Sequence, residues 1–314
     1  MLFITRNSFW LRSLPIFCLL LSTKPAQNLA LYLDGDGDYI NLPTIIINSP
    51  TFTIEAWARM EGLGGGNKTS NPIFQQRDDI PGDYHSAIIL YAERYEPNQT
   101  STFWVRSNNN PANFVEYPHP NYGEWHHYAG VCDQNRIYLY IDGMLVDSTL
   151  NTQSGNYTTS IDYIDIGRHR FNLLDQGFFY GYLDEIKIWN TARTQSEIFA
   201  DMELSPTGFE ANLLAYWNFQ DGMANDATPN GNNGTLMGNA NVVPLELPIL
   251  CQIPGDVNAD NMVDIFDILT VADHVLGQAT DTFQWFCADC NQDGIINIID
   301  IICILQIIFN PGLN

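Results

Sequence analysis

Two acidic segments of twelve residues, 256–267 and 289–300, constrain this chain more than any other feature of its sequence. Each segment has an oxygen-bearing side chain at positions 1, 3, 5, 9 and 12 and an apolar residue at position 7. The residues at these positions are Asp256, Asn258, Asp260, Met262, Asp264 and Asp267 in the first segment, and Asp289, Asn291, Asp293, Ile295, Asn297 and Asp300 in the second. Calcium prefers such a set of side-chain oxygens, completed by the backbone carbonyl of position 7. The spacing therefore predicts one bound calcium ion in each segment.

A solvated acidic turn is the alternative interpretation of either segment taken alone. Position 6 of a calcium loop turns with a positive φ, and the two segments place Asn261 and Gly294 there. Both residue types tolerate this conformation. Two copies in the same register, each leading into an apolar helical pattern, favour the calcium-binding interpretation.

An ordinary calcium loop of this kind has a helix on both sides, but here only the exiting helices are predicted. Pro248, Pro254 and Gly255 exclude a helix before the first segment. After Asn297 an apolar run over 298–309 ends before Pro311. After Asp264 the apolar residues that recur at helical spacing before Gly277 are Ile265, Ile268, Leu269, Ala272, Val275 and Leu276. The C-terminal part is thus a loop–helix unit repeated twice.

This repeat over residues 254–314 resembles the dockerin family, which binds calcium in both loops and docks onto cohesin modules of scaffold or surface proteins. The resemblance implies two calcium ions and a cohesin-type partner. In the family, loop positions 10 and 11 often carry small polar residues that help to select the cohesin. Here they are apolar and form the predicted partner face, namely Ile265, Phe266, Ile298 and Ile299. The second helix is apolar on nearly every side, which is compatible both with packing on its sister helix and with docking to a partner.

Residues 29–245 show the pattern of an all-β domain. Short alternating runs recur every ten to fifteen residues with turn residues between them, for example 52–58, 102–106, 137–141 and 182–189. Asp142-Gly143 is a two-residue hairpin signal, and one short helix is predicted from Thr194 to Met202 with Thr194 or Ser196 as its N-cap. Many evenly spaced strands with one apolar face predict an antiparallel sandwich of two sheets.

Several stretches of this region, such as "FTIEAWARM", "WHHYAGVCD" and "GYLDEIKIWNTARTQSEI", resemble the LamG-like, concanavalin A-like jellyroll of secreted bacterial proteins. The resemblance implies a jellyroll sandwich and a structural calcium ion between the first turn and the penultimate strand, with Asp184, either Asp36 or Asp38, and backbone carbonyls as ligands. An Asp/Gly turn chosen for its positive φ is the alternative at the first turn. The fold hosts lectins, glucanases and adhesion modules, so it does not by itself specify a function.

Carbohydrate recognition is predicted to involve aromatic residues in loops, and the candidates are Tyr95 and Tyr122. Catalysis is not predicted, because a retaining glycosidase on this fold needs two carboxylates on one strand face and no Glu-x-Asp-x-Glu run occurs. Asp184 and Glu185 are adjacent and are expected to point to opposite faces of their strand. Glu55, His126 and His127 are interpreted as structural.

Charge and targeting signals indicate an exported protein. Thirteen Lys and Arg oppose 36 Asp and Glu, which gives a formal net charge of −23 and argues against nucleic acid or anionic lipid as partners. Residues 1–26 have the pattern of a signal peptide, with Arg6 and Arg12 before a short apolar run. No other stretch is long and apolar enough to predict a membrane span. A secreted, extracellular or surface-associated location is therefore expected.

The cysteines support this location. Five follow the predicted signal peptide, and all but Cys132 fall near the C-terminus: Cys251, Cys287, Cys290 and Cys303. In an exported protein they predict disulfide bonds in the small C-terminal module, with the pairing left open. Cys132 is predicted to be a buried thiol. A zinc site at Cys287-x-x-Cys290 is not favoured, because no second ligand pair accompanies it.

Together these patterns predict an exported, non-catalytic protein with four parts: a signal peptide (1–26), a LamG-like jellyroll sandwich (29–245), a linker (246–253) and a dockerin-like module (254–314). The sandwich is expected to recognise a glycan or a surface protein. The module is expected to fold on calcium and to dock onto a cohesin-type partner. The alternatives are a polysaccharide-degrading glycoside hydrolase or a subunit of such a complex, and a purely structural adhesin.

Overall fold

The computed structural model describes most of the chain between residues 28 and 309. The described residues are 28–43, 46–66, 69–77, 87–94, 99–107, 111–153, 157, 163–171, 174–245, 247–248, 251, 253–258, 260–278, 284–291 and 296–309. The predicted signal peptide, part of the predicted linker, Tyr95, Asp293 and Ile295 lie outside them.

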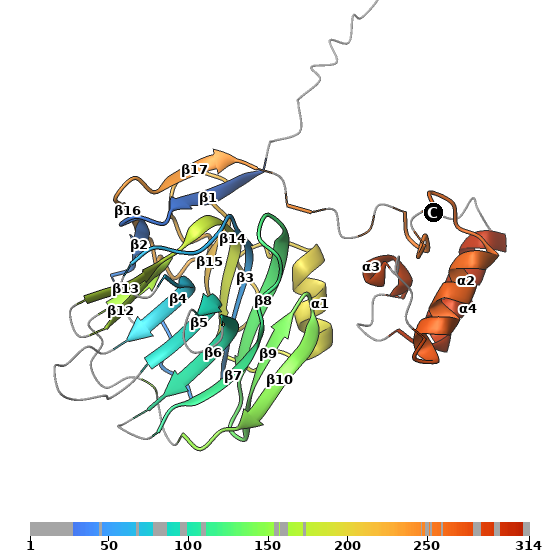
Figure 1. The fold of residues 1–314 in the computed structure, drawn as a ribbon, viewed down its shortest axis with the longest axis horizontal. Coiled ribbons are helices and arrows are strands. Elements are labelled where there is room, and N and C mark those ends of the chain that lie inside the picture. The colour runs from blue at the N-terminus through green and yellow to red at the C-terminus, as the bar shows by residue number, and fades with distance from the viewer. Residues whose placement is uncertain are drawn as a thin grey trace, which may run out of the picture.

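Two antiparallel sheets form the large domain, as the alternating pattern predicts (Figure 1). In sheet order, the first sheet consists of β10 (Met144–Leu150), β9 (Arg136–Ile141), β8 (Trp125–Cys132), β3 (Phe52–Met60), β14 (Tyr180–Trp189), β1 (Leu29–Asp34) and β17 (Asn241–Pro244), with β15 (Leu213–Trp217) also paired to β14. The second consists of β16 (Thr235–Met237), β2 (Tyr39–Asn41), β11 (Tyr163–Ile166), β4 (Asn71–Arg77), β5 (Ala87–Arg94), β6 (Thr100–Arg106) and β7 (Asn113–Pro118). A separate hairpin of β12 (Arg168–Phe171) and β13 (Leu174–Phe178) contacts β4.

The hydrophobic core of the sandwich lies between the facing sides of the two sheets. Every second residue of a strand contributes to it, for example Ile54 and Ala56 of β3 and Phe103 and Val105 of β6. The intervening residues lie on the outer sides. The predicted Asp142-Gly143 hairpin joins β9 and β10, and both residues have the positive φ of a type I′ turn, 50° and 73°.

One short helix, α1 (Gln195–Glu203), covers part of the outer side of the first sheet (Figure 1). It begins where the sequence predicts, because the Thr194 side chain accepts the backbone N–H of Glu197 and the Glu197 side chain caps the Thr194 N–H in return. Ile198 anchors the helix against Ala129 and Val131 of β8. The helix therefore buries part of the outer side of the first sheet, whose inner side faces the core.

The C-terminal module has the two predicted exiting helices, α2 (Ile265–Val275) and α4 (Ile298–Phe309), which pack against each other. Among the described residues no helix precedes the first loop, as the prolines require. A single helical turn not foreseen from the sequence, α3 (Trp285–Ala288), precedes the second loop. The small core of the module consists of Val257, Ile268, Val271, Ala288 and Ile304.

Two disulfide bonds support this small core. Cys251 pairs with Cys287, and Cys290 pairs with Cys303. The first bond fastens the segment before the first loop to α3, and the second fastens the second loop to α4. Cys132 is a free and fully buried thiol, as predicted. No described helix is long and apolar enough to cross a bilayer.

Candidate metal centres and binding surfaces

The first acidic loop is closed by the carboxylate of its last residue. Asp267 is fully buried, and its Oδ1 accepts the backbone N–H of Val257 at 2.7 Å and of Asn258 at 3.1 Å. Its Oδ2 accepts the N–H of Asp264 at 2.8 Å. Asp267 thereby ties positions 2, 3 and 9 of the loop to the first turn of α2.

The first residue of the same loop holds its middle. Asp256 is buried, and its two oxygens accept the N–H groups of Asp260 at 3.1 Å and of Asn261 at 2.9 Å. Asn261 has a φ of 69°, so the turn expected at position 6 is present although the residue is not glycine. The Asp264 Oδ1 accepts the N–H of Phe266 at 2.7 Å and so caps α2.

The second loop repeats these contacts in its described residues. The Oδ2 of the fully buried Asp300 accepts the N–H of Asn297 at 2.8 Å, and its Oδ1 accepts that of Asn291 at 3.4 Å. The Asn297 side chain accepts the N–H of Ile299 at 2.7 Å. Asp300, Asn297 and Ile299 thus occupy the roles of Asp267, Asp264 and Phe266. The two loops therefore share one architecture, beyond the shared spacing of their residues.

The donor chemistry of the loops fits calcium. Each carboxylate oxygen has two lone pairs, so an oxygen that accepts one N–H can still bind a cation. Within the described residues, however, no three His, Cys, Asp or Glu side chains are gathered so as to hold a metal ion. The hydrogen bonds shape the loop without bringing its carboxylates to one point, and the expected ligand set also includes Asn258 and the Met262 carbonyl.

Both helices of the module expose apolar side chains at equivalent positions. Ile265, Phe266 and Leu269 of α2 are 55%, 60% and 52% exposed. Residues 33 positions later in α4 match them, since Ile298, Ile299 and Ile302 are 68%, 52% and 49% exposed. The opposite side of α4 packs into the core through Ile304. The predicted partner face is therefore exposed on both helices, and the packing of α4 on its sister helix is also present.

Neither Asp36 nor Asp38 lies beside Asp184, the other candidate ligand of a calcium ion in the sandwich. Asp38 follows the far end of β1 and accepts the backbone N–H groups of Asp34 and Asn239, whereas Asp36 is exposed. Leu31 faces Leu183, so Asp184 lies at the beginning of β1, where its carboxylate accepts the Asn28 amide at 2.9 Å. The turn before Asp38 has Gly35 and Gly37 at φ values of 80° and 86°, as the turn alternative expects.

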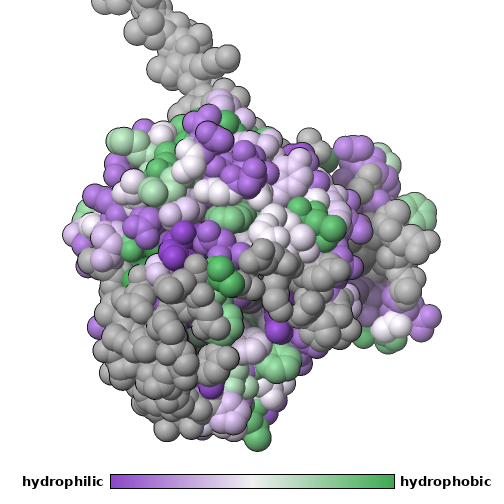
Figure 2. All heavy atoms as spheres, turned by 60° about the vertical axis from the view of Figure 1, so that its left-hand side comes forward, coloured by the Kyte–Doolittle hydropathy of each residue, from purple (hydrophilic) through white to green (hydrophobic). Residues whose placement is uncertain are grey.

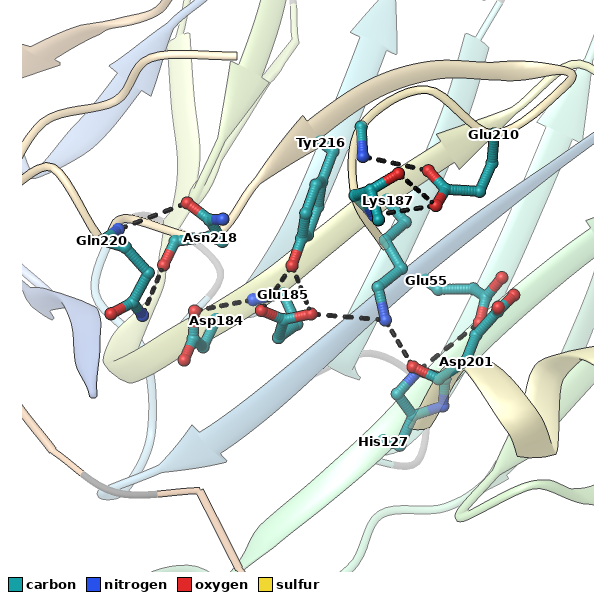
Figure 3. Close-up of polar contacts among 12 residues, drawn as sticks. Glu55, His127, Asp184, Glu185, Lys187, Asp201, Glu210, Tyr216, Asn218 and Gln220 are labelled. Atoms are coloured by element: carbon teal, nitrogen blue, oxygen red, sulfur yellow. Dashed lines mark hydrogen bonds and ion pairs between the residues drawn. The ribbon is translucent and has the colours of Figure 1, made fainter. Parts of the chain in front are cut away.

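The expected opposite orientation of Asp184 and Glu185 is wrong. Strand β14 has a bulge between Asp184 and Lys187, and Glu185 has a φ of 50°. The core therefore receives Leu183 and Ile186, while both acids lie on the outer side of the sheet (Figure 3). Glu185 accepts the Tyr216 hydroxyl at 2.6 Å and lies 3.5 Å from the Lys187 ammonium group.

A buried cluster of charged groups lies on this side of the sheet near α1 (Figure 3). Lys187 is fully buried and donates to the Asp201 carbonyl, and His127 Nε2 is 3.6 Å from Glu55 Oε2. Burial raises the pKa of Glu55 to about 8 and lowers the pKa of His127 well below its ordinary value. Burial therefore favours the neutral form of both groups. Neither is exposed, so neither can touch a substrate in this structure.

Of the two predicted glycan contacts only Tyr122 is described. Its ring stacks on His119 with the centroids 5.1 Å apart, and its hydroxyl donates to Glu93 Oε1 at 2.9 Å. Asn71 donates to the other oxygen of the buried Glu93. Tyr122 thus belongs to a polar group at one end of the seven-stranded sheet. Sequence reasoning missed the arginines on the outer side of that sheet, although Arg77, Arg106 and Arg170 all stand at alternating strand positions.

Each of the two parts of the chain matches a known family of domains. Residues 34–199 match the family model of the concanavalin A-like lectin/glucanases superfamily, and the chain belongs to this family. Residues 254–308 match the family model of the dockerin type I domain. A dockerin domain typically binds calcium, implies docking to a cohesin, and suggests an extracellular assembly of the cellulosome type.

Individual relatives are distant. Human and mouse pappalysin-1 are each 23% identical to this chain over 179 residues, which is 55% of this chain but 11% of theirs. Among solved structures, a Bacteroides ovatus protein assigned to carbohydrate binding has a TM-score of 0.55 at 19% identity, covering 71% of this chain and 62% of that one. At this identity the likeness establishes the sandwich fold alone.

Proposed function

We propose that this protein is an exported, non-catalytic binding and assembly protein. Its sandwich recognises a glycan, and its dockerin domain folds on two calcium ions and docks onto a cohesin-type partner. The observation that carries this proposal is the presence, in one chain, of a lectin-type sandwich and of two acidic loops with matching internal hydrogen bonds. The proposed parts are the sandwich (29–245), a linker (246–253) and the docking module (254–314).

The loops prepare the start of each exposed helix. Asp267 and Asp300 fix the backbone of the loop entry, and Asp264 and Asn297 cap the first turns of α2 and α4. Bound calcium would supply positive charge to these acidic loops and hold their ends together. Each loop then positions the apolar residues at its own positions 10 and 11. Calcium binding and the presentation of the docking face are therefore one event.

Carbohydrate recognition by the sandwich is supported by its fold family and by the group around Tyr122. A stacked aromatic ring beside a buried carboxylate and an amide offers the mixture of apolar surface and hydrogen-bonding groups that sugar rings require. The likeness of the sandwich to a Bacteroides ovatus protein assigned to carbohydrate binding agrees with this. A glycan array probed with the full chain tests this half of the proposal. No signal for any saccharide would leave the sandwich as a protein-binding adhesin.

Docking is tested with a panel of cohesin domains and the full-length, oxidised chain. With calcium present we expect at least one cohesin to bind, and a chelator should abolish that binding. Replacing Phe266 and Ile299 together by alanine removes one exposed apolar side chain from each helix and should weaken binding at least tenfold, because apolar anchors dominate such interfaces.

A matched control removes two exposed apolar side chains from the sandwich instead. Leu150 and Phe209 are 63% and 79% exposed, and replacing both by alanine should leave cohesin binding unchanged. Binding that persists in chelator, or that is equally weakened by both pairs of substitutions, would contradict the proposed docking mode.

A further inference from the structure

The few cationic residues of this acidic chain are concentrated on one surface. Of the thirteen Lys and Arg residues, three lie in the predicted signal peptide, which leaves ten. Five of these ten belong to the outer side of the seven-stranded sheet and the β12–β13 hairpin beside it. We name this surface the arginine face, and its members are Arg77, Arg94, Arg106, Arg168 and Arg170.

Strand register places two of these arginines in one row. Tyr163 of β11 opposes Arg77 of β4, which opposes Ala87 of β5, which in turn opposes Arg106 of β6. These residues alternate with core residues such as Ile88 and Val105, so their side chains share the outer side. Neighbouring strands lie about 4.8 Å apart, so Arg77 and Arg106 are separated by roughly 10 Å with only a methyl side chain between them.

Aromatic rings lie among the arginines. The guanidinium of Arg170 is 4.3 Å from the centre of the Tyr163 ring, and that of Arg77 is 4.3 Å from the centre of Phe171. Arg94 lies 4.9 Å over Trp104, whose other neighbour is the stacked ring of Phe114. A guanidinium that stacks on a ring keeps its N–H groups free in its own plane. The Tyr163 and Trp104 rings therefore orient the guanidinium planes of Arg170 and Arg94.

The arginines differ in their ionic partners. Arg168 is paired with the buried Asp165 through two nitrogens at 3.0–3.1 Å. Arg94 and Arg170, in contrast, form no ion pair with any described acidic residue, and both are partly exposed. Among the described residues, neither the buried Nε of Arg170 nor the buried Nε2 of Gln75 has a hydrogen-bond acceptor. The Gln75 Oε1 accepts the Arg170 backbone N–H at 2.9 Å. One small region thus holds two donors that lack acceptors.

We infer that the arginine face binds a glycan that carries carboxylate groups, with Arg170 and Arg94 as the charge-binding residues. The inference rests on the proposed glycan recognition by the sandwich and names the class of glycan. A carboxylate matches the paired donors of a guanidinium, and the neighbouring aromatic rings offer apolar surface for the sugar ring. A chain with a net charge of −23 repels acidic polymers as a whole, so a local excess of arginine is the feature that such a ligand requires.

The test compares acidic saccharides with their neutral counterparts. Isothermal titration of the full chain with calcium present would use trigalacturonate and its methyl ester, and sialyllactose and lactose. The two acidic saccharides both carry carboxylates but have different sugar rings. Comparing them shows whether the carboxylate or the ring determines binding. We expect at least one acidic member to bind at least tenfold more tightly than its neutral counterpart, and increasing salt should weaken this binding.

Substitutions locate the binding. Arg170→Gln and Arg94→Gln, made separately, should each raise the Kd for the acidic saccharide at least fivefold and leave the melting temperature of the sandwich unchanged. Arg136→Gln is the matched control, because Arg136 is a partly exposed arginine of the first sheet that donates to Ser148, and its loss removes the same charge. This control should bind like the unmodified protein.

The outcomes separate this inference from the proposed function. Equal binding of acidic and neutral members, or binding untouched by both arginine substitutions, would overturn the inference and leave glycan recognition standing. Preference for a sulfated saccharide over both acids would overturn the assignment of a carboxylate. Absence of binding to these four saccharides and to every member of a glycan array would remove the inference together with the proposed glycan recognition.

Discussion

At the scale of single residues, the buried aspartates of the acidic loops have the largest consequences. Asp267 and Asp300 are fully buried, and no Lys or Arg among the described residues forms an ion pair with either. A buried carboxylate is ordinarily paired with a cation or binds a metal ion. Backbone N–H groups hold these two in place, and calcium would supply the missing positive charge.

Replacing Asp267 by asparagine tests this role. The substitution keeps the shape of the side chain but removes its charge and one acceptor oxygen, so we expect the affinity of the first loop for calcium to fall at least tenfold. Calorimetric titration of calcium into the full chain would measure this loss. Asp273→Asn removes the same charge from an exposed site on α2 and should have no effect. An unchanged affinity in Asp267→Asn would show that the first loop does not use this carboxylate.

Glu55 gives a second prediction, about the pH dependence of sandwich stability. Its burial raises its pKa to about 8, so between about pH 4.5 and pH 8 the unfolded chain has released a proton that the folded chain retains. Stability contributed by the protonated form is therefore lost as the pH rises through this window. We expect the melting temperature of Glu55→Gln to fall less between pH 5 and pH 8 than that of the unmodified protein.

The control for this pH effect is Glu124→Gln, since the Glu124 side chain is 61% exposed. It should retain the pH dependence of the unmodified protein. The buried Asp184, whose pKa is also raised to about 8, acts in the same direction as Glu55 and remains in both variants. Identical pH profiles for Glu55→Gln and the unmodified protein would mean that Glu55 does not hold its proton in the folded state.

At the scale of elements, the disulfide bonds determine how much of the C-terminal module depends on calcium. Cys290 and Cys303 are 13 residues apart and join the second loop to α4. Closing a loop of this length stabilises the folded state by about 3 kcal/mol in the chain-entropy account. The second loop–helix unit should therefore retain more structure without calcium than its sequence alone would suggest.

Replacing both Cys290 and Cys303 by serine tests this contribution. We expect the variant to need a higher calcium concentration for half-maximal helix formation, measured by circular dichroism, and to lose more helical signal in chelator. The pair Cys251 and Cys287 offers a comparison, because it closes a longer segment of 36 residues outside α4. If loss of the Cys290–Cys303 bond left the calcium concentration for half-maximal helix formation unchanged, this bond would not support the loop.

Local patterns of the sequence predict some elements well and others poorly. The helices after the two loops and the hairpin at Asp142 follow from residues close together in the chain, and the structure confirms them. The positions of Asp184 and Glu185 depend on a bulge that no local pattern signals. The arginine face depends on register, since Arg77 and Arg106 become neighbours only across β5. Helices and turns that depend on residues close together in the chain can be predicted from the sequence, whereas the pairing of distant strands cannot.

At the scale of the whole molecule, the main hydrophobic cores of the sandwich and of the C-terminal module share no residue among those described. One fills the sandwich and the other lies between the loop–helix units of the module. The sandwich core is extensive and contains no residue of the acidic loops, whereas the module core is small and lies directly beside them. Removal of calcium should therefore affect the module and leave the sandwich folded.

The most direct test of this account is a calcium titration of the full-length, oxidised chain, followed by circular dichroism and by calorimetry of the same samples. We expect that the helical signal rises on addition of calcium, that two ions bind per chain, and that the melting transition of the sandwich does not move. A helical signal already complete in chelator, or no bound calcium at millimolar concentration, would contradict the claim that calcium organises the docking module.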